Sequence, residues 1–469
     1  MILNSFLQQP KFKKNGDVKD VLAVALPMLL SMSFDTFMTF IDRLFLSKLG
    51  PCEMNAALGG GGTQIVMMNL FVGVVSYATA MVAQRLGAKK HSDCSRVCVQ
   101  SLYFSLFCIP LVIATIPLGY FMFDMQHLVP EQMEAQRLYF RILIFGSGLM
   151  LVRNAFANFF SGIGDANIVM KAAFAAMIVN VVANYFLIFG VGPFPELGVA
   201  GAAYGTLLGT FVSVVILASV YFSKRNRERF GTASDFRLNF PIMKELLRRG
   251  IPCGIEFFLN MFAFQSLLFL FHGLGAVSAT AASVMFNWDM VAYVPLMGLE
   301  VASTSLVGRY VGAKQGAAAK RSTFSGLKLG WGYSLIIGIL FVFMPGVLTD
   351  IFKPDVGTAS ADALAMFEAA RPMSIFMLRI AIIYIFVEVL LVIYAGALRG
   401  AGDTVWVMFA SAIMNWTVTG TLFVVAYVFH VPAHYAWIAV VALYGTAPLF
   451  FWWRWRSGKW RRHVLEKQA

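Results

Sequence analysis

The sequence predicts an all-α polytopic membrane protein with twelve transmembrane helices in two pseudo-symmetric six-helix bundles. Three observations predict this fold class: apolar runs recur along the whole chain, one long hydrophilic connection lies near the middle, and several motifs occur once in each half. Of the 469 residues, 59% are hydrophobic and 13% are charged, whereas a soluble domain has about 25% charged residues. Because water cannot solvate so much apolar surface, we expect the chain to lie in a lipid bilayer.

The apolar runs predict helices rather than strands. A helix of about 20 residues crosses the hydrocarbon core of a bilayer. The runs are continuously apolar, whereas the strands of a membrane barrel alternate, and only helices or closed barrels satisfy the backbone in lipid. The predicted spans are residues 18–47, 56–84, 96–123, 136–161, 167–191, 197–222, 245–271, 279–308, 323–349, 371–397, 404–429 and 433–455.

The formal net charge of +13 indicates topology rather than binding to nucleic acid. If the N-terminus is cytoplasmic, the basic residues gather in the cytoplasmic segments and the acidic residues in the outer ones. The positive-inside rule then places both termini in the cytoplasm, and we expect the inner membrane of a bacterium. The basic segments are 11–19, 85–96, 224–249, 309–328 and 454–462, and the acidic segments are 124–134, 196 and 350–362.

The only long hydrophilic connection, residues 223–244, divides the chain into two predicted lobes. The N-terminal lobe is 1–222 with spans 1 to 6, and the C-terminal lobe is 245–469 with spans 7 to 12. Six spans return the chain to the same side, so the lobes have parallel orientation. In such folds the substrate site lies between the halves near the midplane.

Three anchors repeat in order between the lobes. Gly87 and Gly312 are expected to end spans 2 and 8 as left-handed caps, and Asp165 and Asp403 are expected to be N-caps of the spans that follow them. Prolines inside apolar spans bend a helix, so the third pair is predicted to form hinges. The offsets are 225 for Pro27 and Pro252, 225 for Gly87 and Gly312, and 238 for Asp165 and Asp403.

With these anchors in place, the chain resembles the multidrug and toxic compound extrusion family from about Val18 to Trp453. The resemblance implies a V-shaped pair of six-helix bundles that opens alternately outward and inward. It also implies antiport, in which Na⁺ or H⁺ enters as a cationic, amphipathic drug or metabolite leaves. The motifs that carry it are FIDRLFLSKLG (40–50), MVAQRLGAKK (81–90), FFSGIGDAN (159–167), GVAGAAYGT (198–206), STSLVGRYVGAK (303–314) and GALRGAGDT (396–404).

Polar groups in the N-terminal lobe predict an ion-coupling site, because ionisable side chains inside spans are costly and usually functional. Asp35 and Asp42 are almost two helical turns apart and share one face of span 1. Asn180 and Asn184 share a face of span 5, and Thr206 adds a hydroxyl in span 6. The oxygens of such a set suit Na⁺, and a buried carboxylate suits a proton. The alternative is that these groups only hold helices together.

The resemblance assigns roles within this set. Asp42 matches the aspartate of the family's first span, and Asn180, Asn184 and Thr206 match its polar cluster. The family often has an aspartate where this chain has Asn184, so one possible charge is missing from a proton network here.

A second ion site is implied for the C-terminal lobe. Glu388 in span 10 stands where the norfloxacin-exporter branch of the family has a cation-binding acid. That branch also has a glutamate in span 7 at the place of Asn260, whereas the acid here is Glu256, one turn earlier. We therefore expect Glu256, Asn260 and Glu388 to face one another, and Na⁺ to bind at Glu388 or at Asp42.

The predicted substrate cavity contains acids and flexible apolar groups. Asp289 and Glu300 lie near one face of span 8, and Trp288 beside Asp289 suits a cationic guest. The alternative is that these two acids pair with a buried arginine, Arg153 or Arg379. Of the 25 Met residues, Met28 and Met285 are expected to line the cavity, because thioethers repack around unlike guests.

Two coupling mechanisms stay open. In one, protonation of Asp42 bends span 1 at Pro27 and expels the drug. In the other, a cation held near Glu388 or by the N-terminal cluster favours the outward form. Apart from the coupling ion, H⁺ or Na⁺, no cofactor is expected, and the expected partners are small organic cations and membrane lipids. We expect a monomer, because one chain forms the cavity between the lobes.

Other classes of membrane protein fit less well. A major-facilitator carrier would have its glycine-rich signature after span 2, where this chain reads QRLGAKKHSDCSR (84–96). A lipid-linked precursor flippase of the same broader superfamily is the main alternative, but it would need several arginines in its cavity to hold pyrophosphate. An enzyme would need a nucleophile with histidine, or a histidine-rich metal set, inside the spans. The six histidines lie at predicted span ends or in loops.

Overall fold

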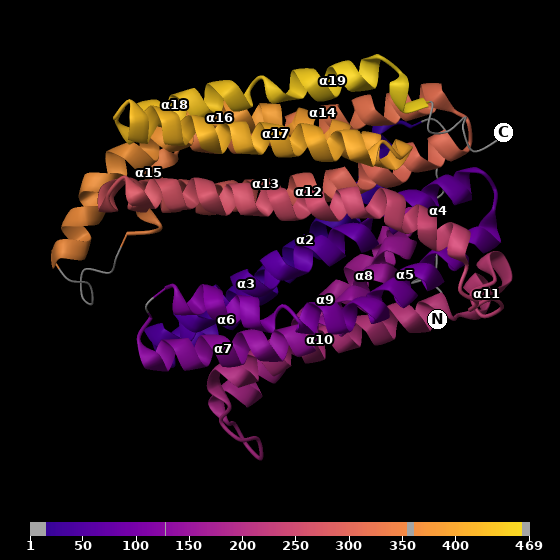
Figure 1. Cartoon of the computed structure of the whole chain (residues 1–469), viewed down its shortest axis with the longest axis horizontal. Coiled ribbons are helices and arrows are strands. Elements are labelled where there is room, and N and C mark those ends of the chain that lie inside the picture. The colour runs from indigo at the N-terminus through magenta and orange to yellow at the C-terminus, as the bar shows by residue number, and fades with distance from the viewer. Residues whose placement is uncertain (1–15, 127, 354–360, 462–469) are drawn as a thin grey trace.

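The computed structural model describes residues 16–126, 128–353 and 361–461, and the regular structure in these ranges is helical (Figure 1). The basic residues before Gly16 and after Arg461, and Asp355, lie outside the described residues. Within them, 11 helices are long and apolar enough to cross a membrane, or up to 12 if the bent pair α7 and α8 is one span. The predicted fold class is confirmed.

The N-terminal half forms six spans from nine helices. Three spans are interrupted: α3 with α4, α5 with α6, and α7 with α8, the last pair bent by 46°. The helices are α2 (Val18–Ser47), α3 (Pro51–Ser76), α4 (Ala78–Gly87), α5 (His91–Ile113), α6 (Ile116–Asp124), α7 (Pro130–Phe145), α8 (Ser147–Ile163), α9 (Ala166–Phe189) and α10 (Gly198–Tyr221).

The C-terminal half repeats this arrangement. Its last two spans end in the π-helical turn η1 (Val424–Val428) and in the short helix α19 with the 3-10 turn η2 (Lys459–Arg461). The helices are α12 (Phe240–Gly273), α13 (Ala276–Gly312), α14 (Gly316–Phe343), α15 (Pro345–Asp350), α16 (Ala361–Ala401), α17 (Thr404–Phe423), α18 (Ala433–Tyr444) and α19 (Ala447–Arg456).

The connection between the halves is more ordered than a hydrophilic loop. It contains α11 (Lys224–Phe230), which ends at Gly231 with φ 65°, and α12 already begins at Phe240. The Asn239 side chain accepts a hydrogen bond from the Ile242 N–H at 3.1 Å and caps α12. Hydropathy missed these turns because they are polar and lie outside the apolar core of the span.

The two halves form two layers that diverge from the end of the molecule where α4 and α11 lie (Figure 1). Between the layers, α12 packs against α3, and α13 packs against α2 and α4. Glycines allow this close approach: a Cβ on Gly73 would come within 2.6 Å of the Gly254 Cα. The Arg85 guanidinium also lies 2.9 Å from the Glu245 carboxylate across the layers.

Two predicted capping roles are corrected. Gly87 and Gly312 end α4 and α13, but the left-handed residues are Lys89 (φ 60°) and Lys314 (φ 59°). The glycines are instead needed for close packing, because a Cβ on Gly87 would lie 1.9 Å from the Arg309 carbonyl oxygen.

The aspartates also differ from the prediction. Asp165 and Asp403 occupy the N-cap positions of α9 and α17, but neither side chain accepts a capping hydrogen bond. The Asp403 carboxylate instead accepts hydrogen bonds of 2.7 and 3.1 Å from Arg454, which joins α17 to α19.

Candidate functional sites in the two lobes

The first candidate site is a buried polar cluster in the N-terminal half, where α2, α9 and α10 pack together. Thr206 Oγ1 donates to Asp42 Oδ2 at 3.0 Å, and Asn184 Nδ2 donates to Asp42 Oδ1. Asn184 Nδ2 also lies 3.3 Å from Asn180 Oδ1, and Asn180 Nδ2 lies 3.4 Å from Thr206 Oγ1. The structure therefore brings together four of the five residues predicted here. We call these four residues the Asp42 cluster.

The Asp42 cluster is buried, so little water reaches its polar atoms. Asn180 and Asn184 are 0% exposed, and Asp42 is 4% exposed. Among the described residues, Asn184 Oδ1 is buried without a hydrogen-bond donor. Gly205 leaves room for this oxygen, because a Cβ there would come within 1.9 Å of it. An unpaired buried acceptor next to a carboxylate suits Na⁺ or a proton on Asp42.

Asp35 shares a helix face with Asp42 but contacts other helices. Both of its carboxylate oxygens lie 2.9 Å from Arg153 Nη2 on α8, and Arg153 Nε lies 3.2 Å from Ser213 Oγ on α10. Asp35 is therefore an ion-paired residue and is not hydrogen-bonded to the Asp42 cluster.

The second candidate site is a cavity of about 460 Å³, formed mainly by α12, α13, α16, α17 and α18 of the C-terminal half and completed by Asn69 and Val72 of α3 and Phe451 of α19. Its lining brings together the predicted ion ligands and the two acids of span 8. The acidic and amide residues that line it are Asn69, Glu256, Asn260, Asp289, Glu300, Glu388 and Asn415, and the aromatic ones include Phe257, Phe264, Phe286, Tyr293, Tyr384, Trp437 and Tyr444. We call this the C-lobe cavity.

The carboxylates of the C-lobe cavity differ in their partners. Arg399 pairs with both Glu256 and Glu300. Asp289 Oδ1 accepts a hydrogen bond from the Tyr384 hydroxyl at 2.5 Å. Glu388 is 8% exposed, and its Oε2 has no hydrogen-bond donor among the described residues. A buried carboxylate oxygen without a donor is a strong attractor for a cation.

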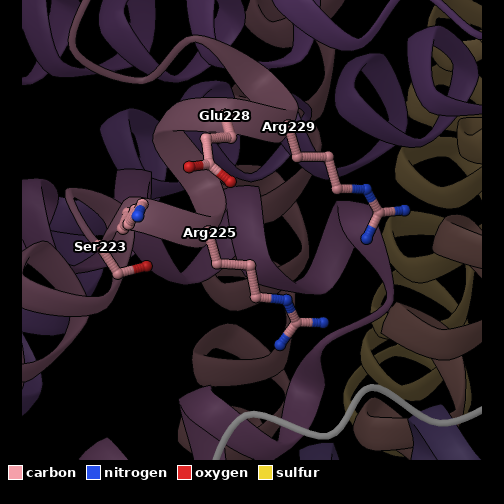
Figure 2. Close-up of a pocket in the computed structure, with 5 residues that line it drawn as sticks. Ser223, Arg225, Glu228 and Arg229 are labelled. Carbon is pink, nitrogen blue, oxygen red and sulfur yellow. The ribbon is translucent and has the colours of Figure 1, made fainter.

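A third hollow, of about 550 Å³, lies at α11, outside the apolar spans. Figure 2 shows that Arg225 and Arg229, one helical turn apart, extend in the same direction from α11, while Glu228 points to the other side. Ser223 and Lys224 complete its lining. This basic hollow lies at the end of the molecule where the two layers meet.

Comparison with known proteins identifies the family. The family model described as MatE matches residues 27–186 and 252–426, so both halves of the chain contribute to the match. The chain belongs to the MatE family. MatE proteins are transporters, and this chain is therefore a transport protein and not an enzyme.

Relatives of this MatE chain cover nearly its whole length. A Thermotoga maritima protein named probable multidrug resistance protein NorM is 27% identical over 466 residues, 96% of this chain and 95% of its own. A protein of the same name from Neisseria meningitidis serogroup B is 25% identical over 452 residues, 95% and 94% of the two chains.

Solved structures show the same fold. A MOP superfamily transporter from Pyrococcus furiosus, described as having a binding pocket of reverse polarity, has a TM-score of 0.85 at 23% identity, covering 96% of this chain and 99% of its own. An outward-facing multidrug resistance MATE family transporter has a TM-score of 0.84 at 23% identity, covering 97% and 100%.

Three residues predicted to line the cavity of this MatE protein lie elsewhere. The Trp288 indole donates to the Leu348 carbonyl at 2.9 Å and packs against Phe352, so it faces α15. Met285 is 0% exposed and contacts the Tyr384 hydroxyl through its sulfur at 3.6 Å. Met28 is buried in the core around α2. The methionines that line the cavity are Met261, Met290, Met297 and Met414.

The predicted partners of the acids are also corrected. Glu300 pairs with Arg399 rather than with Arg153 or Arg379. Arg153 forms an ion pair with Asp35, and Arg379 is exposed on α16. Arg399 lies within the GALRGAGDT motif and eleven residues after Glu388. That spacing is close to three helical turns and places Arg399 on the same helix face as Glu388. It is the feature of the sequence that could have indicated that Arg399 lies at the cavity.

The two proline positions lie inside continuous helices. Pro27 is buried within α2, and Pro252 is buried within α12. Each removes one backbone hydrogen bond from its helix, so each remains a candidate hinge.

Proposed function

We propose that this MatE protein exports organic cations of varied structure in exchange for H⁺ or Na⁺, by alternating access. The C-lobe cavity carries the proposal. Its volume of about 460 Å³ falls in the range of pockets for drug-sized ligands, about 300–1,000 Å³. Four carboxylates and one guanidinium line it, so its charge favours a cation.

The walls of the C-lobe cavity support an organic rather than an inorganic guest. Phe264, Tyr293, Tyr384 and Tyr444 line it together with Asp289 and Glu388, and aromatic faces attract organic cations. Its methionines adapt to guests of different shape. The curated relatives named multidrug resistance proteins favour the same substrate range.

The charge of the cavity argues against a lipid-linked precursor flippase. Such a substrate carries pyrophosphate and needs several free cationic side chains. Arg399 is the arginine that lines this cavity, and two glutamates hold it. An anionic guest would therefore face a net excess of carboxylates.

For coupling, we place the ion at the Asp42 cluster. When Asp42 binds a proton, its hydrogen bonds to Asn184 and Thr206 change, because a neutral acid accepts weaker hydrogen bonds than a carboxylate. α2 packs both against α9 and against α13 of the other half, so a bend at Pro27 would be transmitted between the halves, with Pro252 as the matching hinge in α12.

The second coupling mechanism uses the C-lobe cavity itself, with Na⁺ or a proton at Glu388 and neighbours that include Asn260. Either gradient is sufficient in energy: one charge crossing 100 mV releases about 2.3 kcal/mol, and one pH unit adds about 1.4 kcal/mol. Asp42 remains our first assignment because its cluster joins three helices, with Asp42 on α2 and its partners on α9 and α10.

The proposed setting follows from the charge distribution. We place both termini on the cytoplasmic side of a bacterial inner membrane, with lobes at residues 1–222 and 245–469 and the segment 223–244 between them. The protein works as a monomer in contact with membrane lipids, because both candidate sites are formed within one chain.

The test uses purified protein in liposomes loaded with ethidium. A proton gradient and a Na⁺ gradient are imposed separately on the wild type, Asp42→Asn and Glu388→Gln. Transport driven by protons and abolished in Asp42→Asn supports the first mechanism. Transport driven only by Na⁺ and abolished in Glu388→Gln supports the second.

Empty liposomes and a Ser266→Ala variant serve as controls, because the Ser266 hydroxyl only bonds its own helix at Phe262. If neither gradient moves any cation tried, the proposed function is wrong, and anionic lipid-linked substrates become the next class to assay.

A further inference from the structure

Arg399 joins three helices of the C-terminal half through two carboxylates. Its Nη2 and Nε lie 2.7 and 3.2 Å from the two oxygens of Glu256 on α12. Its Nη1 pairs with Glu300 on α13. Glu256 is 0% exposed, and the side chains of Arg399 and Glu300 are 12% and 15% exposed. We call these three residues the Arg399 triad.

The Arg399 triad already occupies most of the hydrogen-bonding capacity of Glu256. One oxygen of Glu256 accepts from Arg399 Nη2 and from Ser411 Oγ at 3.0 Å, and the other accepts from Arg399 Nε. A guanidinium is always charged in a protein, so Arg399 supplies a permanent positive charge to Glu256. Glu256, one of the predicted ion ligands, therefore already has a cation that is part of the chain.

The two carboxylates of the cavity outside the triad, Asp289 and Glu388, do not pair with Arg399. Asp289 is hydrogen-bonded to Tyr384, and Glu388 Oε2 has no donor among the described residues. Glu388 also experiences the negative charge of Asp289. The Arg399 triad has two carboxylates for one guanidinium, whereas Asp289 and Glu388 lack an arginine partner among the described residues, so most of the unbalanced negative charge of the C-lobe cavity lies at Glu388 and Asp289.

We propose that Arg399 sets the charge selectivity of the C-lobe cavity, so that the transporter prefers organic monocations to dications. By neutralising Glu256 and holding Glu300, Arg399 leaves one carboxylate region for one cationic centre. A second cationic centre of a guest would meet glutamates that are already paired, and the guanidinium would repel it. This inference rests on the proposed function, because it assigns the class of substrate to the same cavity.

Ethidium and propidium provide a matched pair of probes. They share one aromatic ring system, and propidium carries an additional quaternary ammonium group. The experiment measures the dissociation constant of each dye for the purified full-length protein by fluorescence titration. The readout is the ratio of the two constants, so that general changes in affinity cancel.

We expect the wild type to bind ethidium more tightly than propidium. Arg399→Gln removes the internal cation and is expected to shift the ratio toward propidium by about tenfold or more, since an additional unpaired charge in a poorly solvated site acts strongly on a second cationic centre. Arg399→Lys keeps the charge and is expected to keep the wild-type preference.

The double variant Arg399→Gln with Glu256→Gln separates charge from packing. It lacks the arginine but has the same net charge as the wild type, so we expect its ratio to return toward the wild-type value. If Arg399→Gln does not fold, Glu256→Gln alone tests the inference. With one carboxylate fewer, its ratio is expected to shift further toward ethidium.

An unchanged ratio in Arg399→Gln, a double variant that behaves like Arg399→Gln, or a wild type that prefers propidium would each overturn the inference. If Glu256→Gln is the only variant that folds, a shift of its ratio of dissociation constants toward propidium would overturn the inference. The wild-type ethidium titration tests the proposed function separately. If neither ethidium nor any other organic cation tried binds, the proposed function fails and the inference fails with it, whereas binding with an unchanged ratio overturns the inference alone.

Discussion

The guanidinium of Arg153 lies 2.9 Å from both carboxylate oxygens of Asp35 and ties α2 to α8. Arg153 Nε also lies 3.2 Å from Ser213 Oγ on α10. Asp35 stands between the candidate hinge Pro27 and Asp42 on the same helix. The ion pair therefore holds the part of α2 that would have to move if a bend at Pro27 follows ion binding at Asp42.

Asp35→Asn is expected to lower the free energy of unfolding by about 1 kcal/mol or less, because both side chains of this pair are partly exposed. Gradient-driven ethidium transport should retain its dependence on the coupling ion, because Asp42 contacts different helices. Thermal unfolding and the liposome assay measure the two effects, with Arg153→Lys as the conservative control. Loss of ion dependence would place Asp35 in the coupling site.

Gly87→Ala is expected to be strongly destabilising. A Cβ at this position would lie 1.9 Å from the Arg309 carbonyl oxygen, so the two halves must separate at the α4–α13 contact. Overpacking of this kind costs about 1–3 kcal/mol or more. Melting temperature in detergent measures the effect. Gly332→Ala is the matched control, because nothing lies within 4 Å of a Cβ there; equal melting temperatures for the two variants would refute the packing role.

Arg85→Met is expected to loosen the contact between α4 and α12. The pair with Glu245 is nearly buried, with side chains 13% and 14% exposed, so removal of one partner should cost roughly 2 kcal/mol, between the values for surface and buried pairs. We expect faster maleimide labelling of Cys253, which is 2% exposed on α12.

Mass spectrometry identifies which thiol reacts in this labelling experiment. Cys108, 1% exposed in the core of the N-terminal half, is the internal reference. If Cys253 and Cys108 are labelled at rates equal to those of the wild type, Arg85 does not hold the two halves together. If both rates rise equally, the variant unfolds instead of opening.

Asp235 gives a pH prediction outside the spans. The Arg237 N–H and then the Arg96 side chain lower the pKa of this carboxyl below its ordinary value. A lowered pKa stabilises the folded form fully above the ordinary value of about 3.9, and the stabilisation is lost as pH falls through the lowered pKa. Hydrogen exchange of residues 231–239, compared at each pH with Asp235→Asn, should differ at pH 7 and converge in strong acid. Equal exchange at pH 7 would contradict this.

Much of the fold could be predicted because the duplication left motifs that repeat at a fixed offset in the sequence. The anchors at offset 225 correspond to equivalent backbone: Lys89 and Lys314 have φ angles of 60° and 59°, and each of the two terminal glycines packs on a carbonyl of the other half. What these glycines do was not predictable, because the sequence does not reveal that α4 and α13 cross at this point.

The candidate sites also contain some features that the sequence predicted and others that it did not. The Asp42 cluster was predictable because Asn180 and Asn184 lie one helical turn apart and because all four members match a family pattern. The partners of the C-terminal acids were not, since Arg399 is 99 residues from Glu300 in the chain and only packing of α13 on α16 brings them together. Trp288 was misplaced because it faces α15, whereas its neighbour Asp289 accepts a hydrogen bond from Tyr384 on α16.

By itself, the sequence determined the membrane environment, the twelve apolar spans, the duplication and the candidate polar residues, because hydropathy, helical spacing and repeated motifs are local properties of a chain. Only the tertiary structure decided which carboxylates are ion-paired: Asp35 with Arg153, and Glu256 and Glu300 with the single guanidinium of Arg399. It also left Glu388 Oε2 without a donor among the described residues. Ion pairing depends on distances of a few ångströms between helices, and those distances are set by packing rather than by spacing along the chain.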